Sequence, residues 1–142
     1  MIPGYVVSSN SDEMDLTRIH SNISKSYWSS GVPIETLKVA IENSLCFGVF
    51  TLGRVQVGFG RMVTDYATFA YLADVYIEEA HQGKGLSKWL MKEIHDHPSL
   101  QGLRRILLAT KDAHGLYKKF GYTELDNPSV FMEKWDRNVY SK

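Results

Sequence analysis

The sequence has a single cysteine, no excess charge of either sign and no long apolar run, and each shortage narrows the class of protein. One cysteine, Cys46, excludes an internal disulfide and favours a reducing compartment, so we expect a cytoplasmic protein. Sixteen basic residues match sixteen acidic ones, so no overall field attracts nucleic acid or an anionic membrane, and neither is an expected partner. No apolar run approaches the roughly 18 residues that span a bilayer. The segment Met1 to Tyr5 lacks the basic end and apolar stretch of a signal peptide.

The composition is that of one globular domain. With 142 residues and 44% apolar side chains the chain can bury one core, and we expect a single domain over residues 1–142. Cys46 lies in the apolar run 45–50, which predicts a buried small side chain and not a nucleophile. The predicted elements, in chain order, are a helix from Ser11 or Asp12 to about Tyr27, a helix from Pro33, strands over 45–52, 55–63 and 69–77, a helix from Leu86 to Asp96, a strand over 105–110, a short helix capped by Asp112 and stopped by Gly121, and a strand over 130–135.

This order of elements predicts an α+β fold. Short turns join the three central strands, so we expect them to be antiparallel. The helix between strands 69–77 and 105–110 makes a single parallel crossover. We therefore predict a mostly antiparallel sheet with one parallel pair and about four helices packed against it.

A glycine-rich loop, His81-Gln82-Gly83-Lys84-Gly85-Leu86-Ser87, lies between a predicted strand and a predicted helix. Glycines let the backbone approach an anion, and the free N–H groups of the first helical turn point at that anion. A Walker A loop needs Ser or Thr after Gly-Lys, where this chain has Gly85. A Rossmann fingerprint needs a third glycine, where this chain has Lys88. The loop therefore predicts a phosphate site that belongs to neither the Walker A nor the Rossmann type. The alternative is a tight turn that only starts a helix, which would also use glycine.

The spacing Gln82-x-x-Gly85-x-Ser87 resembles the Gln/Arg-x-x-Gly-x-Gly/Ala signature of the GCN5-related N-acetyltransferase (GNAT) superfamily. The preceding segment 72–77 is similar to that family's central strand. Residues 113–122 are similar to its helix that ends in Tyr-x-x-x-Gly-Phe/Tyr. The resemblance covers nearly the whole chain and implies the GNAT fold, with strands that splay apart. Ser87, where Gly or Ala is usual, and Glu79, where proline is common, depart from the pattern.

The resemblance implies acetyl-CoA as cosubstrate. Loop amides would bind the pyrophosphate of coenzyme A, and backbone groups of the preceding strand would pair with the pantetheine arm like an added strand. The implied cofactor-binding residues are Val75, Tyr76, Ile77, Gln82, Gly83, Lys84, Gly85, Leu86 and Ser87. No metal is expected, because His95 and His97 have no cysteine nearby and no carboxylate at ligand spacing.

Two residues are candidates for the catalytic chemistry of acetyl transfer. Tyr117 matches the tyrosine that the family places near the coenzyme sulfur, which implies that its phenol protonates the leaving thiolate; the alternative is a core tyrosine on the apolar stripe of its helix. Asp74 is a charge inside an apolar strand. It is a candidate for taking the amine's proton through water or binding a cationic acceptor, and the alternative is a structural carboxylate paired with an arginine such as Arg61. Tyr71 lies where some relatives carry a catalytic glutamate and is a poor base, so the general base is not assigned.

The acceptor site is the least defined part of the hypothesis. The candidates for its lining, at spacings that are more often those of a core, are Tyr27, Trp28, Tyr66, Phe69 and Tyr71. We expect an N-acetyltransferase that acts on a primary amine of a small molecule or a protein by direct attack, because Cys46 is expected to be buried and far from the loop. The alternatives are a non-catalytic module that binds or senses coenzyme A and a mononucleotide-binding domain. A homodimer is also plausible, because small members of the family often pair.

Overall fold

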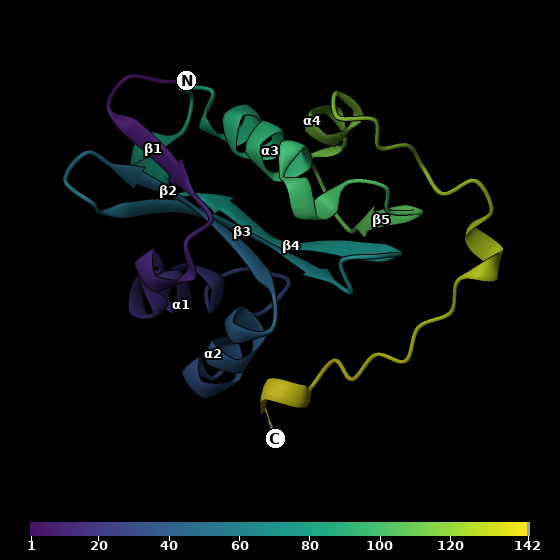
Figure 1. The fold of residues 1–142 in the computed structure, drawn as a ribbon. Helices are drawn as coiled ribbons and strands as arrows, with labels where there is room; N and C mark the ends of the chain where they lie inside the picture. Colours follow the sequence, from purple (N-terminus) through teal and green to yellow (C-terminus); the bar gives the residue numbers. More distant parts are fainter. Residues whose placement is uncertain (142) are drawn as a thin grey trace.

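The computed structural model describes residues 1–141, which are organised around a five-stranded sheet (Figure 1). The strands are β1 (Tyr5–Ser8), β2 (Leu45–Thr51), β3 (Gln56–Thr64), β4 (Phe69–Ile77) and β5 (Arg105–Leu108). They lie in the order β1-β2-β3-β4-β5, and every neighbouring pair is antiparallel except β4 and β5. The predicted mixed sheet, with its three central antiparallel strands and single parallel crossover, is confirmed.

Helices cover both faces of the sheet. One face carries α3 (Leu86–Asp96) and α4 (His114–Lys118), and the other carries α1 (Leu16–Ile23) and α2 (Ile34–Glu42) (Figure 1). Each face has its own apolar core, the larger one under α3 and the smaller one against α1 and α2. The described part of the chain also contains five 3-10 turns: η1 (Ser11–Glu13), η2 (Glu79–His81), η3 (Pro98–Leu100), η4 (Pro128–Val130) and η5 (Val139–Ser141). Among residues 1–141, no helix is long and apolar enough to cross a membrane.

The first helix is shorter than its apolar spacing predicts. Its cap is Asp15, whose carboxylate accepts the N–H of Arg18 at 3.1 Å, and not Ser11 or Asp12, which belong to η1. The helix ends at Ile23 because the Ser26 hydroxyl donates to the Ile23 carbonyl at 2.6 Å and competes with the helical pattern. The prediction of a helix from Ser11 or Asp12 to Tyr27 was therefore wrong at both ends.

Two strand predictions failed near the chain ends. The strand β1, which pairs with β2, was not predicted. The predicted strand over 130–135 is absent: apart from the turns η4 and η5, residues 123–141 form no regular element. We call residues 123–141 the arm, and it runs outside the sheet (Figure 1). A strand needs a neighbour for its backbone hydrogen bonds, and the path of the arm supplies none.

A β-bulge in β4 reverses which face its side chains occupy. Ala73 and Tyr76 are three residues apart, whereas their partners on β3, Arg61 and Phe59, are two residues apart, so β4 has one extra residue here. Asp74 lies within this bulge and has a φ of +59°. Before the bulge, Ala70 and Leu72 pack into the core under α3, and after it Val75 and Ile77 do so. The odd and even positions exchange faces, which keeps the carboxylate of Asp74 out of that core.

The sheet opens where β4 extends beyond the end of β5. Their pairing starts at Phe69 with Arg105 and stops at Leu72 with Leu108, while β4 continues to Ile77. The edge of β4 beyond Leu72 therefore has no strand beside it within residues 1–141. The predicted splayed strands are present, and this open edge positions the candidate site.

Candidate active site

Two cavities follow the open edge of β4. The first, of about 360 Å³, lies beside the bulge and is lined by Tyr27, Trp28, Ser29, Arg61, Tyr71, Leu72, Ala73, Asp74, Val75, Thr110, Asp112, Ala113 and Tyr117. The second, of about 430 Å³, lies at the glycine loop and is lined by Ile77, His81, Gln82, Gly83, Gly85, Leu86, Ser87, Lys88 and Leu116. Consecutive residues of α4, Leu116 and Tyr117, line one cavity each. We call the first cavity the bulge end and the second the loop end.

The loop end is built from backbone amides. Gly83 and Gly85 have φ of +79° and +84°, a conformation that favours glycine. Gly85 is the cap residue of α3 and supplies no side-chain cap, so the N–H groups of the first turn of this 11-residue helix have no intrahelical partners. The helix dipole adds positive potential at the same point, so this arrangement fits a phosphate group.

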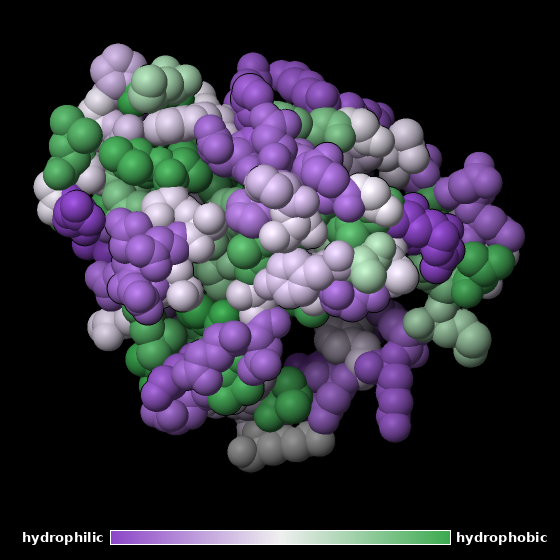
Figure 2. Space-filling view, in the orientation of Figure 1, coloured by the Kyte–Doolittle hydropathy of each residue, from purple (hydrophilic) through white to green (hydrophobic). Residues whose placement is uncertain are grey.

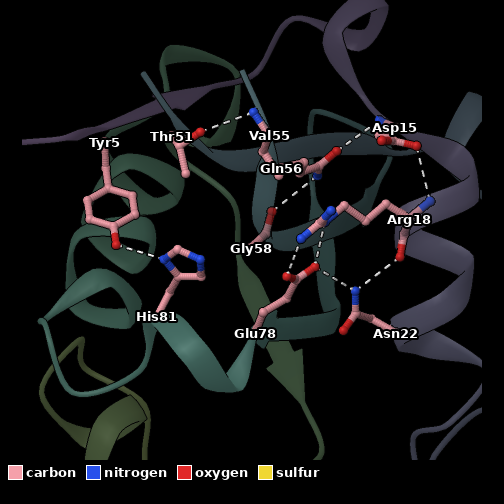
Figure 3. Close-up of polar contacts among 10 residues, drawn as sticks. All are labelled: Tyr5, Asp15, Arg18, Asn22, Thr51, Val55, Gln56, Gly58, Glu78 and His81. Carbon is pink, nitrogen blue, oxygen red and sulfur yellow. Dashed lines mark hydrogen bonds and ion pairs between the residues drawn. The ribbon is translucent and has the colours of Figure 1, made fainter. Parts of the chain in front are cut away.

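Four hydrogen bonds fix the glycine loop, and Glu78 just before it, to α1 and to β1. Arg18 of α1 donates two hydrogen bonds to Glu78, at 2.6 and 2.8 Å, and Asn22 donates a third to it at 3.0 Å (Figure 3). The guanidinium of Arg18 lowers the pKa of Glu78. A hydrogen bond of 2.7 Å joins the Tyr5 hydroxyl on β1 to Nδ1 of His81 (Figure 3). These contacts hold the loop in place before any ligand arrives.

Gln82 has a local role that its place in the signature did not predict. Its side-chain amide donates to the carbonyl of Ile77 at 2.8 Å, which closes the turn between β4 and the loop. Lys84 and Ser87 lie on the loop and in the first turn of α3, as predicted. Lys88 on α3 lies close enough to Lys119, just after α4, that its ammonium lowers the pKa of Lys119. Two neighbouring ammonium groups beside the loop make this end attractive to an anion.

The predicted cofactor-binding residues of β4 do not all face the opening. The N–H of Glu78 donates to Val57 on β3, so the backbone of Tyr76, two residues earlier, also faces β3. The ring of Tyr76 packs near Phe59 on the far side of the sheet. Val75 and Ile77 alternate with it and present their backbone groups to the open edge. Of the three strand residues implied by the resemblance, Tyr76 is thus the one turned away from the cleft.

At the bulge end Asp74 is not a free carboxylate. Arg61 donates from Nε to Asp74 at 2.7 Å, and the Trp28 indole N–H donates to the other oxygen at 2.8 Å. The side chain of Asp74 is 4% exposed, so these partners offset the loss of water around its charge. The structure thus shows Asp74 as a structural carboxylate paired with Arg61, which was the alternative to a catalytic role. This pairing does not favour the hypothesis that Asp74 takes the amine's proton.

Tyr117 lies between the two ends. It is 9% exposed and packs edge-on against Tyr122, and it lines the bulge end. Within residues 1–141 the structure gives its hydroxyl no hydrogen-bond partner. Burial, together with nearby Tyr27 and Asp112, raises the pKa of the Tyr117 phenol. A phenol with a raised pKa stays protonated at neutral pH and is available as a proton donor.

Asp112 does not have the predicted role of helix cap. The cap residue of α4 is Ala113, whose N–H donates to the Thr110 hydroxyl at 3.1 Å. Asp112 instead lines the bulge end and is exposed to solvent there. The other lining residues, such as Trp28 and Asp74, come from distant elements, so the sequence offered no signal that Asp112 lies at this cavity.

The aromatic predictions were partly correct. Tyr27, Trp28 and Tyr71 line the bulge end, whereas Tyr66 and Phe69 do not. Cys46 is buried as expected, and burial raises the pKa of its thiol to about 11. His95 contacts the Met91 carbonyl and the Tyr122 hydroxyl. Among residues 1–141, no group of three His, Cys, Asp or Glu side chains is placed to hold a metal ion.

An opened mixed sheet with an uncapped helix N-terminus at the opening suits a protein that binds a phosphate-bearing cosubstrate along a strand edge. Comparison with known proteins agrees with this class. Residues 42–124 match the model of a family described as an acetyltransferase (GNAT) domain. A presumed acetyltransferase of Gibberella zeae is 32% identical over 137 residues, which cover 81% of this chain and 76% of that protein. The chain belongs to the GNAT acetyltransferase family.

Solved structures agree with this assignment. A presumed GNAT-family acetyltransferase from Xanthomonas campestris pathovar campestris is 43% identical and superposes with a TM-score of 0.95 over all of both chains. A presumed acetyltransferase from Deinococcus radiodurans, 15% identical, shares the fold with a TM-score of 0.73 over 99% of this chain and 92% of that one. The predicted GNAT fold is confirmed.

Proposed function

We propose that this protein transfers the acetyl group of acetyl-CoA to a primary amine. The observation that carries the proposal is the single open edge of β4, which runs from an uncapped helix N-terminus to a buried tyrosine hydroxyl. The loop amides and Ser87 would hold the pyrophosphate, and Val75 and Ile77 would pair with the pantetheine arm. The thioester would then lie near Tyr117, between the two cavities.

The chain's own groups support direct attack. The amine nitrogen, after its ammonium form has lost one proton to water, attacks the thioester carbon. The carbon–sulfur bond then breaks, the thiolate takes a proton from Tyr117, and the nitrogen releases its second proton through water, which restores the Tyr117 phenol and leaves a neutral amide. Cys46 is buried in the other core, which disfavours an acetyl-cysteine intermediate. Asp74 would orient Arg61 and Trp28 at the rim of the acceptor site. Asp112, a carboxylate at this end for which the described residues provide no ion pair, would attract the ammonium form of the acceptor.

The acceptor is proposed to be a small molecule or a protein amine, and a cytoplasmic location stays a prediction from the single cysteine. A coenzyme A-binding module without turnover is the alternative. It has no separate observation in its favour, and a broad panel of amines distinguishes it from the enzyme.

Tyr117→Phe tests the proposal directly. We expect the dissociation constant of acetyl-CoA to stay within about twofold, whereas turnover of an acceptor found in the panel falls by about a hundredfold, the range of general acid catalysis. Tyr122→Phe is the matched control, because Tyr122 lies beside Tyr117 and its hydroxyl bonds His95 and not the cavity. Acetyl-CoA binding measured by calorimetry with no acetylated amine anywhere in the panel would favour the module, and unchanged turnover in Tyr117→Phe would remove Tyr117 from the chemistry.

A further inference from the structure

Three exposed aromatic side chains gather at the bulge end. Tyr27 is 56% exposed, Trp28 45% and Tyr71 38%, and all three line this cavity. Apolar side chains also lie at the surface around β1 and the turn between β2 and β3 (Figure 2). The exposed ones there, such as Val6 and Leu52, are aliphatic and line neither end of the cleft. Scattered aliphatic side chains are normal at a surface, whereas exposed rings that share one cavity are suited to a ligand.

Polar contacts hold two of these rings in place. The indole N–H of Trp28 donates to Asp74 at 2.8 Å, and the ring of Tyr27 packs edge-on against that of Trp28, with 5.0 Å between the centroids. The Tyr27 hydroxyl accepts the backbone N–H of Lys111 at 3.3 Å, and the Lys111 ammonium lies over the Tyr27 ring. Both rings are therefore fixed but not covered. A fixed ring loses little conformational entropy when a ligand packs against it.

The third ring comes from the sheet. Ala70 and Leu72 of β4 point into the core under α3, and side chains alternate along a strand, so Tyr71 points to the opposite face, which carries α1 and α2. Within residues 1–141 the structure gives the Tyr71 hydroxyl no hydrogen-bond partner. Aromatic surface from two separate elements thus lines one cavity, and the ring of Tyr71 can be removed without breaking a hydrogen bond.

The charges at the bulge end suit an amine that has no carboxylate. Among residues 1–141, Arg61 is the one cationic side chain in the lining, and its charge is paired with Asp74. Asp112 also lines the cavity, and it lies near enough to Tyr117 to contribute to the raised pKa of that phenol. An ammonium group is therefore attracted toward Asp112 and Tyr117, whereas a carboxylate would find no unpaired cation in the lining.

We propose that the acceptor is a small amine that carries an aromatic ring and no carboxylate, as phenethylamine does. This inference rests on the proposed function and names the chemical class of its acceptor. The ring of the acceptor lies against Trp28 and Tyr71, and its amine extends toward Asp112 and Tyr117. Aromatic pairs stabilise a complex beyond the apolar area that they bury, so this site prefers an aromatic ring to a saturated one. The cavity volume of about 360 Å³ suits a molecule of this size.

Two amines that differ only in their ring test this preference. Phenethylamine and cyclohexylethylamine carry the same ammonium group on the same chain, and the cyclohexyl ring is the more apolar. If apolar area or charge alone decided, the cyclohexyl amine would be acetylated at least as well. We expect kcat/KM to be about fivefold higher for phenethylamine. Phenylalanine should be poorer than phenethylamine by about fivefold, because its carboxylate lies near Asp112 without a cation to pair with.

Substitutions at Tyr71 show whether the bulge end is the source of the preference. Tyr71→Leu removes one ring and should at least halve the ratio of kcat/KM between phenethylamine and cyclohexylethylamine. Tyr71→Phe is the matched control, because it keeps the ring and should keep the ratio. Tyr66→Leu removes a ring that is 53% exposed but lies outside the cavity, and it should change neither amine. Equal kcat/KM for the two amines in the natural chain, or an unchanged ratio in Tyr71→Leu, would overturn the proposal.

Binding without turnover separates this proposal from the proposed function. Calorimetry in saturating coenzyme A gives the dissociation constants of both amines when no acetyl group is present. Tighter binding of phenethylamine with no acetylation of any amine would support the aromatic site and contradict the enzyme. Acetylation of both amines with equal kcat/KM would support the enzyme and contradict the aromatic site. If neither amine binds and none is acetylated, both proposals fail.

Discussion

The two ends of the cleft are built in different ways. The loop end consists of backbone amides from consecutive residues, and its side chains mainly hold the loop in place, as Gln82 does for Ile77. The bulge end consists of side chains from elements far apart in the chain, where Trp28, Arg61 and Asp74 meet. A backbone site suits a ligand group that never changes, such as a phosphate. A side-chain site can change from one relative to another, which suits an acceptor pocket.

The largest expected effect is a loss of stability from a substitution at the bulge end that leaves the loop end unchanged. Asp74→Asn keeps an acceptor for Trp28 but leaves the half-buried Arg61 without its ion pair and with only the hydrogen bond that it donates to the Ser44 hydroxyl, so we expect the free energy of unfolding to fall by about 3 kcal/mol. Urea unfolding measures this loss, and Asp96→Asn is the control, because its pair with Lys92 is exposed and should change stability by only about 0.5 kcal/mol. Where the variant is folded, its affinity for coenzyme A should be unchanged; a large loss of affinity would mean that the two ends are coupled.

The next effect concerns the backbone of the loop end. Gly85→Ala places a side chain at φ +84°, which costs about 1–2 kcal/mol, and we expect the affinity for coenzyme A to fall about tenfold because the loop leaves this conformation. Gly102→Ala has the same strain, at φ +75°, in a turn outside both cavities. Both variants should lose similar stability in thermal unfolding. Equal affinities in calorimetry would show that the loop amides do not hold the ligand.

A smaller effect sharpens the assignment of the acceptor site. Asp112→Asn removes the carboxylate that lines the bulge end without an ion pair among the described residues, and we expect KM for a cationic amine to rise about fivefold with kcat within about twofold. Asp126→Asn, an exposed carboxylate on the arm, is the control for a simple change of net charge. An equal rise of KM in both variants would contradict a specific role for Asp112.

The smallest effect depends on pH and concerns an anchor of the glycine loop. Arg18 lowers the pKa of Glu78 below its ordinary value of 4.5 in the folded chain. The pair therefore adds stability above that value, and the contribution is lost as the pH falls through the folded-state pKa. The difference in unfolding free energy between the natural chain and Glu78→Gln should shrink as the pH falls from 7 toward 3, measured by chemical unfolding at each pH. A difference that stays constant would assign the stabilisation to something other than the charge of Glu78.

The contrast between the two ends also explains what could be predicted from sequence. The loop, α3 and the three central strands rest on local patterns, so the positions of Gly83 and Gly85 could be inferred from the chain alone. The ion pair between Arg18 and Glu78 joins residues 60 positions apart, and no local pattern announces it. Asp112 has the sequence context of a cap, and only the tertiary fold turns it toward the cavity.

The strand predictions fail for a similar reason. The strand β1 has four residues directly after Pro3 and Gly4, too few for a recognisable alternation. The side chains of residues 130–135 suit a strand, but a local sequence pattern does not show whether another strand lies beside the segment to accept its backbone hydrogen bonds.

The exposure of the arm has a consequence for the lifetime of the protein. Proteases cut extended, exposed segments first, and the arm offers Lys134 and Arg137 to a trypsin-like enzyme. Cleavage after Lys134 would remove only residues that line neither cavity and belong to no strand of the sheet. Limited trypsin digestion would therefore shorten the protein while leaving its candidate active site whole.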